Sequence, residues 1–145
     1  MAGSRRIARE FAVQGLYAWL VGGADATLVA AHLAEDEHFR HADADYFRTL
    51  LYGVVAAHDQ LAADIAPYLD RPVAELSPVE RAILLIGAYE LRHCPDVPWR
   101  VVINEGVELA KKFGGTDGHK YINGVLDKLA QAMRAVEIAA AKRKA

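Results

Sequence analysis

SPVERAILLIGAYEL, residues 77–91, is the segment of the sequence that says most about the fold. It opens with Ser77, a residue type that caps helices, followed by Pro78 at the first helical position and Glu80 at the third, the pattern of a capping box. The helix that follows is apolar on every side from Ala82 to Ile86. A helix without a polar face has to be buried, so we predict that this segment forms the central helix of the fold.

Further helices are predicted on both sides of this segment from apolar residues that recur every three or four positions. We expect helices from the cap Ser4 to Gly22-Gly23, from Thr27 to about Glu35, from Asp45 to Pro67, from Trp99 to Gly114-Gly115, and from a cap at Thr116 or Asp117 to about Val136. The acidic stretch from Glu35 to Asp45 is predicted to be a loop.

These patterns predict an all-α fold, a compact bundle of about six or seven helices in two linked groups of three. A chain of 145 residues has the size of one domain, so we assign residues 1–145 to a single unit with a short, basic, flexible tail from about residue 138. Gly15, Gly106 and Gly124 lie inside helical stripes, and we expect them to permit close approach between helices.

The net charge of −2 is distributed unevenly along the chain. Residues 1–24 carry +2 and residues 100–145 carry +4, whereas residues 25–70 carry −7. If the two basic ends pack together, they form a positive face suited to phosphate groups. The alternative is an ordinary scatter of solvated charge.

Two segments are candidates for RNA contact. The first helix opens with Arg5, Arg6 and Arg9, which can clamp phosphates or stack on bases, although solvated arginines would give the same pattern. The second is KKFGGTDGHKY, residues 111–121, where lysines and two aromatic residues flank a flexible turn that suits single-stranded RNA. The alternative is a core phenylalanine followed by a helix cap.

Other kinds of site find little support in the sequence. It contains no phosphate-binding glycine loop and no zinc motif, and His32, His38 and His41 cross a predicted loop, where solvated histidines are the better interpretation. Glu105 and Glu108 form the nearest helical carboxylate pair, which a solvated helix face explains better than acid–base catalysis. We therefore expect no enzyme activity, no metal and no cofactor.

The expected location is the cytoplasm. The chain has one cysteine, Cys94, and its first residues lack the apolar core of a signal peptide. No apolar stretch reaches the roughly 20 residues that a membrane helix requires, so no membrane contact is expected.

Three stretches resemble the signature segments of the NusB family. They are RRIAREFAVQGLY at 5–17, VPWRVVINE at 97–105 and HKYINGVLDK at 119–128. The resemblance extends over about residues 4–134. It implies an all-helical transcription antitermination factor that binds boxA RNA of nascent ribosomal RNA together with ribosomal protein NusE, as a non-catalytic scaffold on RNA polymerase.

The resemblance also implies which residues take part. The RNA side would comprise Arg5, Arg6, Arg9, Phe113, Thr116, Asp117, Lys120 and Tyr121. The NusE side would lie near Glu75 and Glu80. Family members differ in whether they form homodimers, so a homodimer is possible.

Two alternatives stay open at this point. One is the NusB-like domain that precedes the catalytic domain of some ribosomal RNA cytosine methyltransferases; the end of the chain at Ala145 and the segment 123–128 favour the free-standing factor instead. The other is a helical adaptor between proteins that never contacts RNA.

Overall fold

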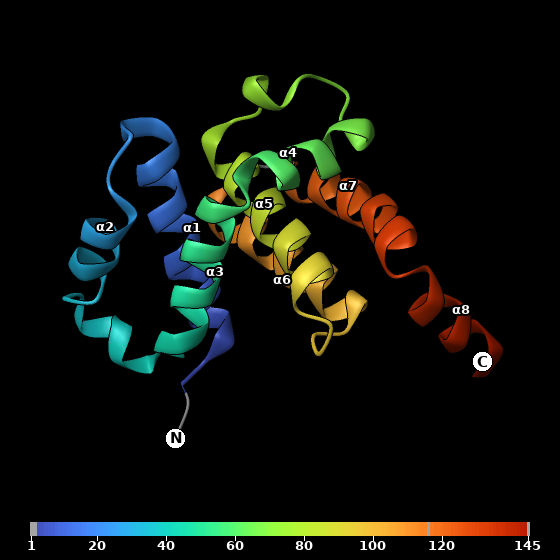
Figure 1. Ribbon diagram of the computed structural model, residues 1–145, viewed down its shortest axis with the longest axis horizontal. Coiled ribbons are helices and arrows are strands. Elements are labelled where there is room, and N and C mark those ends of the chain that lie inside the picture. Colours follow the sequence, from blue (N-terminus) through green and yellow to red (C-terminus); the bar gives the residue numbers. More distant parts are fainter. Residues whose placement is uncertain (1–2, 116, 145) are drawn as a thin grey trace.

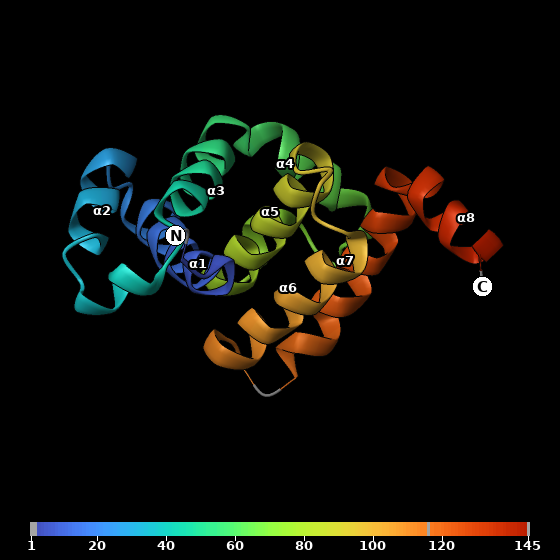
Figure 2. The ribbon, with the colours of Figure 1, turned by 90° about the horizontal axis from the view of Figure 1, so that it is seen from below.

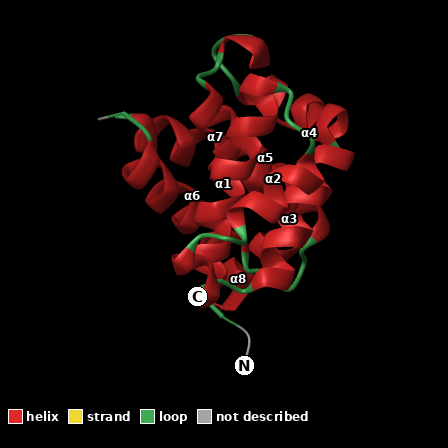
Figure 3. Cartoon of the chain, turned by 90° about the vertical axis from the view of Figure 1, so that its left-hand side faces the viewer, coloured by secondary structure: helices red, strands yellow, loops and turns green. Residues whose placement is uncertain are grey.

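The computed structural model describes residues 3–115 and 117–144, and these ranges contain eight α-helices and three short 3-10 helices (Figure 1). The helices are α1 (Arg5–Gly22), α2 (Ala26–Leu33), η1 (Glu37–His41), α3 (Ala44–Ala56), α4 (His58–Ile65), η2 (Ala66–Tyr68), η3 (Val73–Glu75), α5 (Pro78–His93), α6 (Trp99–Phe113), α7 (Gly118–Met133) and α8 (Ala135–Lys144). The described ranges contain no strand (Figure 3). The all-helical prediction is confirmed, but the expected number of six or seven helices was too low.

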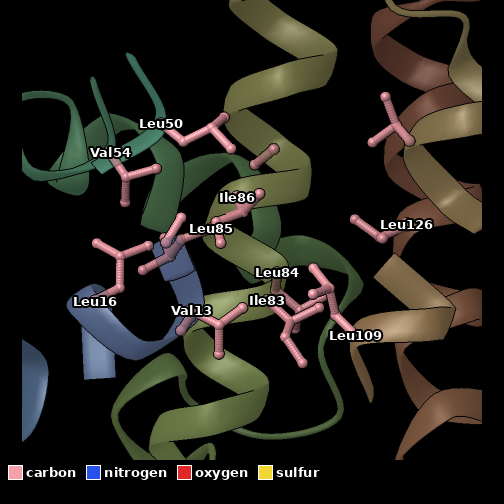
Figure 4. Close-up of a cluster of buried hydrophobic side chains, with 14 of the residues drawn as sticks. Val13, Leu16, Leu50, Val54, Ile83, Leu84, Leu85, Ile86, Leu109 and Leu126 are labelled. Carbon is pink, nitrogen blue, oxygen red and sulfur yellow. The ribbon is translucent and has the colours of Figure 1, made fainter. Parts of the chain in front are cut away.

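Helix α5 is central, as its sequence predicted. Its start is capped by Ser77, whose Oγ accepts a hydrogen bond from the Glu80 N–H at 3.2 Å. Side chains of α1, α3, α6 and α7 surround its apolar residues, with Leu16, Leu50 and Leu126 among those drawn in Figure 4. Burying each such side chain contributes roughly 1.5–3 kcal/mol, so this contact surface holds the other helices in place.

The start of α1 is fixed by local hydrogen bonds. Ser4 Oγ accepts from the Ile7 N–H at 3.0 Å, which caps the helix as predicted. The backbone of Ser4 also donates to the His41 carbonyl and accepts from the Asp43 N–H. At the other end, Gly23 has φ of 64°, a left-handed conformation that favours glycine. The backbone hydrogen bonds of Ser4 attach the first turn of α1 to the segment between η1 and α3.

The segment from Glu35 to Ile65 differs from the prediction in two places. The expected loop contains the 3-10 helix η1, capped by Asp36, and the expected long helix is interrupted at Ala57. Both helices contribute to the core, because α3 buries Phe47, Leu51 and Val54 and α4 buries Leu61 and Ile65. The ring of His58, the first residue of α4, packs edge-on against Trp19 and accepts a hydrogen bond from Arg81 at 3.0 Å.

The last predicted helix is also two helices. Arg134 interrupts it, because its buried guanidinium donates to backbone carbonyls at the end of α5 and in the loop that follows. The acceptors are the carbonyls of Glu90, Leu91, Cys94 and Val97, at 2.8–3.1 Å. The carbonyls of Glu90 and Cys94 also accept from the N–H groups of Cys94 and Val97, so the guanidinium adds a second hydrogen bond to each of these two.

The turn at Arg134 changes which residues of the final segment are buried. Val136, at the end of the predicted helix, is 83% exposed, whereas Ile138 is buried. The predicted flexible tail from about residue 138 belongs to α8, which extends away from the other helices (Figures 1 and 2).

The interior glycines differ in what surrounds them. A Cβ atom at Gly106 would lie 2.6 Å from Leu126 Cδ1, and one at Gly87 would lie 2.6 Å from Leu126 Cδ2. A Cβ atom at Gly15 would contact Leu51 at 3.2 Å. The expectation for Gly124 was wrong, because nothing lies within 4 Å of a Cβ atom placed there. Close packing therefore requires glycine at the positions that face Leu126.

Alanine substitutions at Gly87 and Gly124 test this difference. Gly87→Ala should lower the free energy of unfolding by about 1–3 kcal/mol, because the fully buried Leu126 has to move. Gly124→Ala should raise it by about 0.4–1 kcal/mol, because alanine restricts the unfolded chain and meets no obstacle in the helix. Urea denaturation measures both, and equal effects of the two substitutions would contradict the packing argument.

Candidate nucleic-acid interface

The structure brings the two candidate RNA-binding segments together. Helices α1 and α6 lie against each other, and the turn between α6 and α7 follows directly (Figure 2). Three ion pairs connect α1 to α6: Arg6 Nη2 to Glu105 Oε2 at 2.8 Å, Arg9 Nη1 to Glu105 Oε1 at 3.2 Å, and Lys112 Nζ to Glu10 Oε1 at 3.0 Å. The exposed surface of these two helices and the turn is called the α1–α6 face below.

Arg5 and Arg6 are the arginines of the first turn that reach solvent. The Arg6 side chain is 62% exposed, and its Nε and Nη2 donate to both oxygens of Glu105. The hydrogen bond from Arg6 to Glu105 raises the pKa of the guanidinium. The Arg5 side chain is 45% exposed; it lies 4.2 Å from the centroid of the Tyr46 ring and 3.4 Å from Asp96. Both guanidinium groups are held in place and accessible from outside.

Arg9 has a different environment. The residue is only 4% exposed, and its Nε and Nη2 donate to the two oxygens of Glu90 at 2.9 and 2.8 Å. Its Nη1 donates to Glu105 at 3.2 Å, so the guanidinium joins both carboxylates. The Tyr46 hydroxyl donates to Glu90 as well. The Arg9 guanidinium is thus almost wholly buried and engaged by carboxylates, and its expected contact with RNA stays a prediction.

Burial also affects the neutral groups of this network. The pKa of Tyr46 is raised, first because burial disfavours the phenolate and then because Glu90 is close. Burial likewise raises the pKa of the Cys94 thiol. Both groups therefore stay protonated at neutral pH, and the charges of the network are those of Arg9, Glu90 and Glu105.

The turn between α6 and α7 presents polar groups to solvent. Asp117 and Lys120 are exposed, with Nζ and Oδ1 3.7 Å apart. Asp117 occupies the N-cap position of α7, as one of the two expectations had it, but its side chain makes no capping hydrogen bond; the alternative cap, Thr116, lies outside the described residues. Phe113 is half-buried against the core, and Lys112 Nζ lies 5.8 Å from its ring centroid.

Tyr121 is held by a different part of the chain. Its hydroxyl donates to Asp70 Oδ1 at 3.0 Å and accepts from the Asp70 N–H at 3.3 Å. The Arg71 guanidinium lies 5.2 Å from the ring centroid. Hydrogen bonds from Arg71 and then from Tyr121 lower the pKa of Asp70 to about 2. Tyr121 therefore joins α7 to the segment between η2 and η3.

The candidate partner residues Glu75 and Glu80 lie in the segment that follows. Glu75 is exposed at the end of η3, and the Glu80 carboxylate accepts a hydrogen bond from Ser77 Oγ at 2.9 Å. Glu80 also lies near the start of α7, since its Oε2 is 3.8 Å from a Cβ atom placed at Gly118. The candidate RNA and partner sites therefore adjoin at the start of α7.

The α1–α6 face is not the strongly positive surface that the charge distribution suggested. Five basic side chains described on or beside it have a carboxylate within 4 Å, whereas the exposed Arg100 on α6 lies 5.1 Å from the Trp99 ring centroid and pairs with no carboxylate of the described residues. The pairs are Arg5 with Asp96, Arg6 with Glu105, Lys111 with Glu108, Lys112 with Glu10, and Lys120 with Asp117. A phosphate group that approaches this face has to compete with these carboxylates.

Several residues of this region were missed or misread in the sequence. Glu105 was interpreted as part of a solvated helix face, but the residue is only 9% exposed and binds Arg6 and Arg9. Glu90 could have been found, because it is a carboxylate that lies between the apolar stretch Ala82–Ile86 and Leu91 in a helix predicted to be central. Nothing in the local sequence of Asp70 indicated its bond to Tyr121.

The described residues also bear on metal binding and on membranes. Residues 3–115 and 117–144 contain no group of three or more His, Cys, Asp or Glu side chains arranged to hold a metal ion. Within these same ranges, no helix combines the length and the apolar character needed to cross a lipid bilayer.

Replacing Arg9 tests its structural role. Arg9→Met should lower the free energy of unfolding by about 3–5 kcal/mol, because Glu90 would remain buried without its charge partner. Arg5→Met is the matched control and should cost at most about 1 kcal/mol, since its ion pair is exposed. Chemical denaturation measures both variants, and equal stability of the two would show that the buried pairing is dispensable.

Comparison with known proteins gives a consistent result. The model of the NusB family matches residues 6–131. The transcription antitermination protein NusB of Thiobacillus denitrificans is 74% identical over 144 residues, which cover 99% of each chain. That of Ralstonia pickettii is 59% identical over 137 residues, which cover 94% of this chain and 88% of the relative.

Solved structures agree with the sequence comparison. The NusB of T. maritima has a TM-score of 0.81 at 27% identity, covering 90% of this chain and 93% of that one. A chain from a crystal structure of the antitermination factors NusB and NusE in complex with dsRNA has the same TM-score and identity, covering 88% and 96%. The match over residues 6–131 and the identity of 74% along nearly the whole length show that the chain belongs to the NusB family.

Proposed function

We propose that this protein is a transcription antitermination factor that binds boxA RNA of nascent ribosomal RNA together with NusE, as a non-catalytic scaffold on RNA polymerase. Its relatives are named as transcription antitermination proteins, and a related structure contains NusB, NusE and RNA. The observation that carries the proposal is the meeting of exposed Arg5 and Arg6 with Lys112 and the α6–α7 turn on one face. This role places the protein in the cytoplasm, and it needs no cofactor.

We assign the RNA contacts to the α1–α6 face. Arg5 and Arg6 would bind phosphates or stack on bases, because their guanidinium groups are accessible and oriented by their neighbours. The α6–α7 turn would add Phe113, Thr116, Asp117 and Lys120. Arg9 acts as a positioning residue, since its contacts with Glu90 and Glu105 hold α1 against α5 and α6.

The NusE site would lie beside this face, around Glu75 and Glu80. These carboxylates adjoin the start of α7, where Tyr121 joins α7 to the segment between η2 and η3. An RNA strand on the α6–α7 turn would therefore pass close to a partner bound at Glu75. Tyr121 would shape the boundary between the two sites and be available to stack on RNA only after leaving Asp70.

The packing of the helices fits a scaffold that forms one domain from two linked groups of helices. Helix α1 packs on α2, α3 and α5, and α5 packs on α6 and α7. The central α5 is thus shared by an amino-terminal and a carboxyl-terminal group. A homodimer that covered the α1–α6 face would block RNA, so self-association would regulate this function.

The paired charges of the face predict weak binding of RNA alone and stronger binding with NusE. Titration of a boxA-type single strand, a scrambled strand and a duplex, each with and without NusE, measures this. The boxA strand with NusE should give the tightest binding. Equal, very weak binding in all arms would leave a protein adaptor, and preference for the duplex would contradict the single-strand proposal.

Substitution of the two exposed arginines tests the RNA side. Changing Arg5 and Arg6 together to Ala should weaken binding and reduce the slope of log K against log salt by about 1.4, since each phosphate contact on a single strand contributes about 0.7. The melting temperature should hold. Arg48→Ala is the control, because this half-exposed arginine pairs with Asp45 on α3. An unchanged slope in the double variant would remove these arginines from the interface.

A further inference from the structure

A small pocket lies between α1 and α6 on the α1–α6 face. Its volume is about 120 Å³, and its lining includes Arg6 and Glu10 from α1, with Glu105, Glu108 and Lys112 from α6. An apolar cavity of about 150 Å³ accommodates benzene, so this pocket has room for the edge of one planar ring but not for a whole nucleotide.

The charges of the pocket are balanced. Arg6, Arg9 and Lys112 supply three cations, and Glu10, Glu105 and Glu108 supply three carboxylates. A phosphate placed here would meet the carboxylates as well as the cations, which disfavours it. The edge of a nucleobase carries hydrogen-bond donors beside acceptors, so it can pair with both kinds of group.

Existing bonds determine which groups can receive a ligand. Glu105 is occupied: Oε1 accepts from Arg6 and Arg9, and Oε2 accepts from Arg6. The Glu10 side chain is 17% exposed and accepts from Lys112 through Oε1, while its Oε2 has no hydrogen-bond partner among the described residues. Glu10 therefore presents a partly desolvated carboxylate with an ammonium group next to one of its oxygens.

This arrangement matches one base better than the others. Guanine has two adjacent donors, N1–H and the N2 amino group, and its acceptor O6 lies next to N1. A carboxylate can accept both donors through its two oxygens. The Lys112 ammonium beside Oε1 would then lie on the O6 side. Adenine, cytosine and uracil do not offer two neighbouring donors on this edge.

We propose that the pocket between α1 and α6 binds the Watson–Crick edge of an unpaired guanine in the RNA. Glu10 accepts from N1–H and the N2 amino group, and Lys112 donates to O6. This inference rests on the proposed RNA-binding function and adds base specificity to it. Arg6, 62% exposed at the pocket, is placed to contact the neighbouring phosphate.

The test replaces each guanine of the boxA-type RNA in turn by inosine, which lacks the N2 amino group. Binding is measured in the presence of NusE for the unmodified protein, for Glu10→Gln and for Glu108→Gln. Glu108 is the matched control because it lines the same pocket but is 50% exposed and pairs with Lys111 outside it. Melting temperatures check that both variants fold.

At one guanine, inosine should weaken binding by the unmodified protein about tenfold. The loss should shrink to less than about twofold in Glu10→Gln and persist in Glu108→Gln. An equal loss in Glu10→Gln, or no loss at any guanine, would overturn base recognition while leaving RNA binding intact. If the only effect of Glu10 were to repel phosphate, Glu10→Gln would bind both the guanosine RNA and the inosine RNA more tightly than the unmodified protein does, and by the same factor. Failure of the unmodified RNA to bind would instead overturn the proposed function itself.

Discussion

The structure depends on the buried contact of Arg9 with Glu90 and Glu105. A guanidinium group removed from water is tolerated only when carboxylates compensate its charge, so α1, α5 and α6 have to meet where these side chains can touch. The Tyr46 hydroxyl adds α3 through its bond to Glu90. Apolar burial supplies most of the stability, but it would permit the helices to slide, whereas this network requires one register between them. The exposed Arg6 is oriented by Glu105, a carboxylate of the same network.

Much of the fold follows from local chemistry and could be predicted. Ser4 and Ser77 cap helices, Gly23 ends one, and the apolar stretch after Ser77 is central, because each depends on residues within a few positions. The interruptions at Ala57 and Arg134 could not be predicted in this way. The helix ends at Arg134, whose guanidinium binds carbonyl groups about 40 residues earlier in the chain. The spacing of apolar residues along a helix carries no information about such distant partners.

The candidate site shows the same division between local and distant causes. Arg5, Arg6 and Arg9 look equivalent in the sequence, yet one is buried and two are exposed, because their partners lie more than 80 positions away. Charge counting failed for a related reason. The basic residues of α6 and the start of α1 do meet, but Lys112 finds Glu10 and Arg6 finds Glu105. The net charge of a segment does not reveal that Lys112 and Arg6 each form an ion pair with a carboxylate of the neighbouring helix.

These pairings change how the α1–α6 face can bind RNA. A surface with unpaired lysines and arginines attracts any polyanion, and the attraction carries no sequence information. Beside a cation that is already paired, as Arg6 and Lys112 are, a ligand has to replace the carboxylate contact or bind the carboxylate itself, and only a hydrogen-bond donor can bind the carboxylate. The face therefore has a low affinity for polyanions in general but can still select among RNA sequences. A partner beside Glu75 and Glu80 can add affinity by binding the same RNA strand. The two proteins together then bind the strand tightly, although neither has to bind it tightly alone.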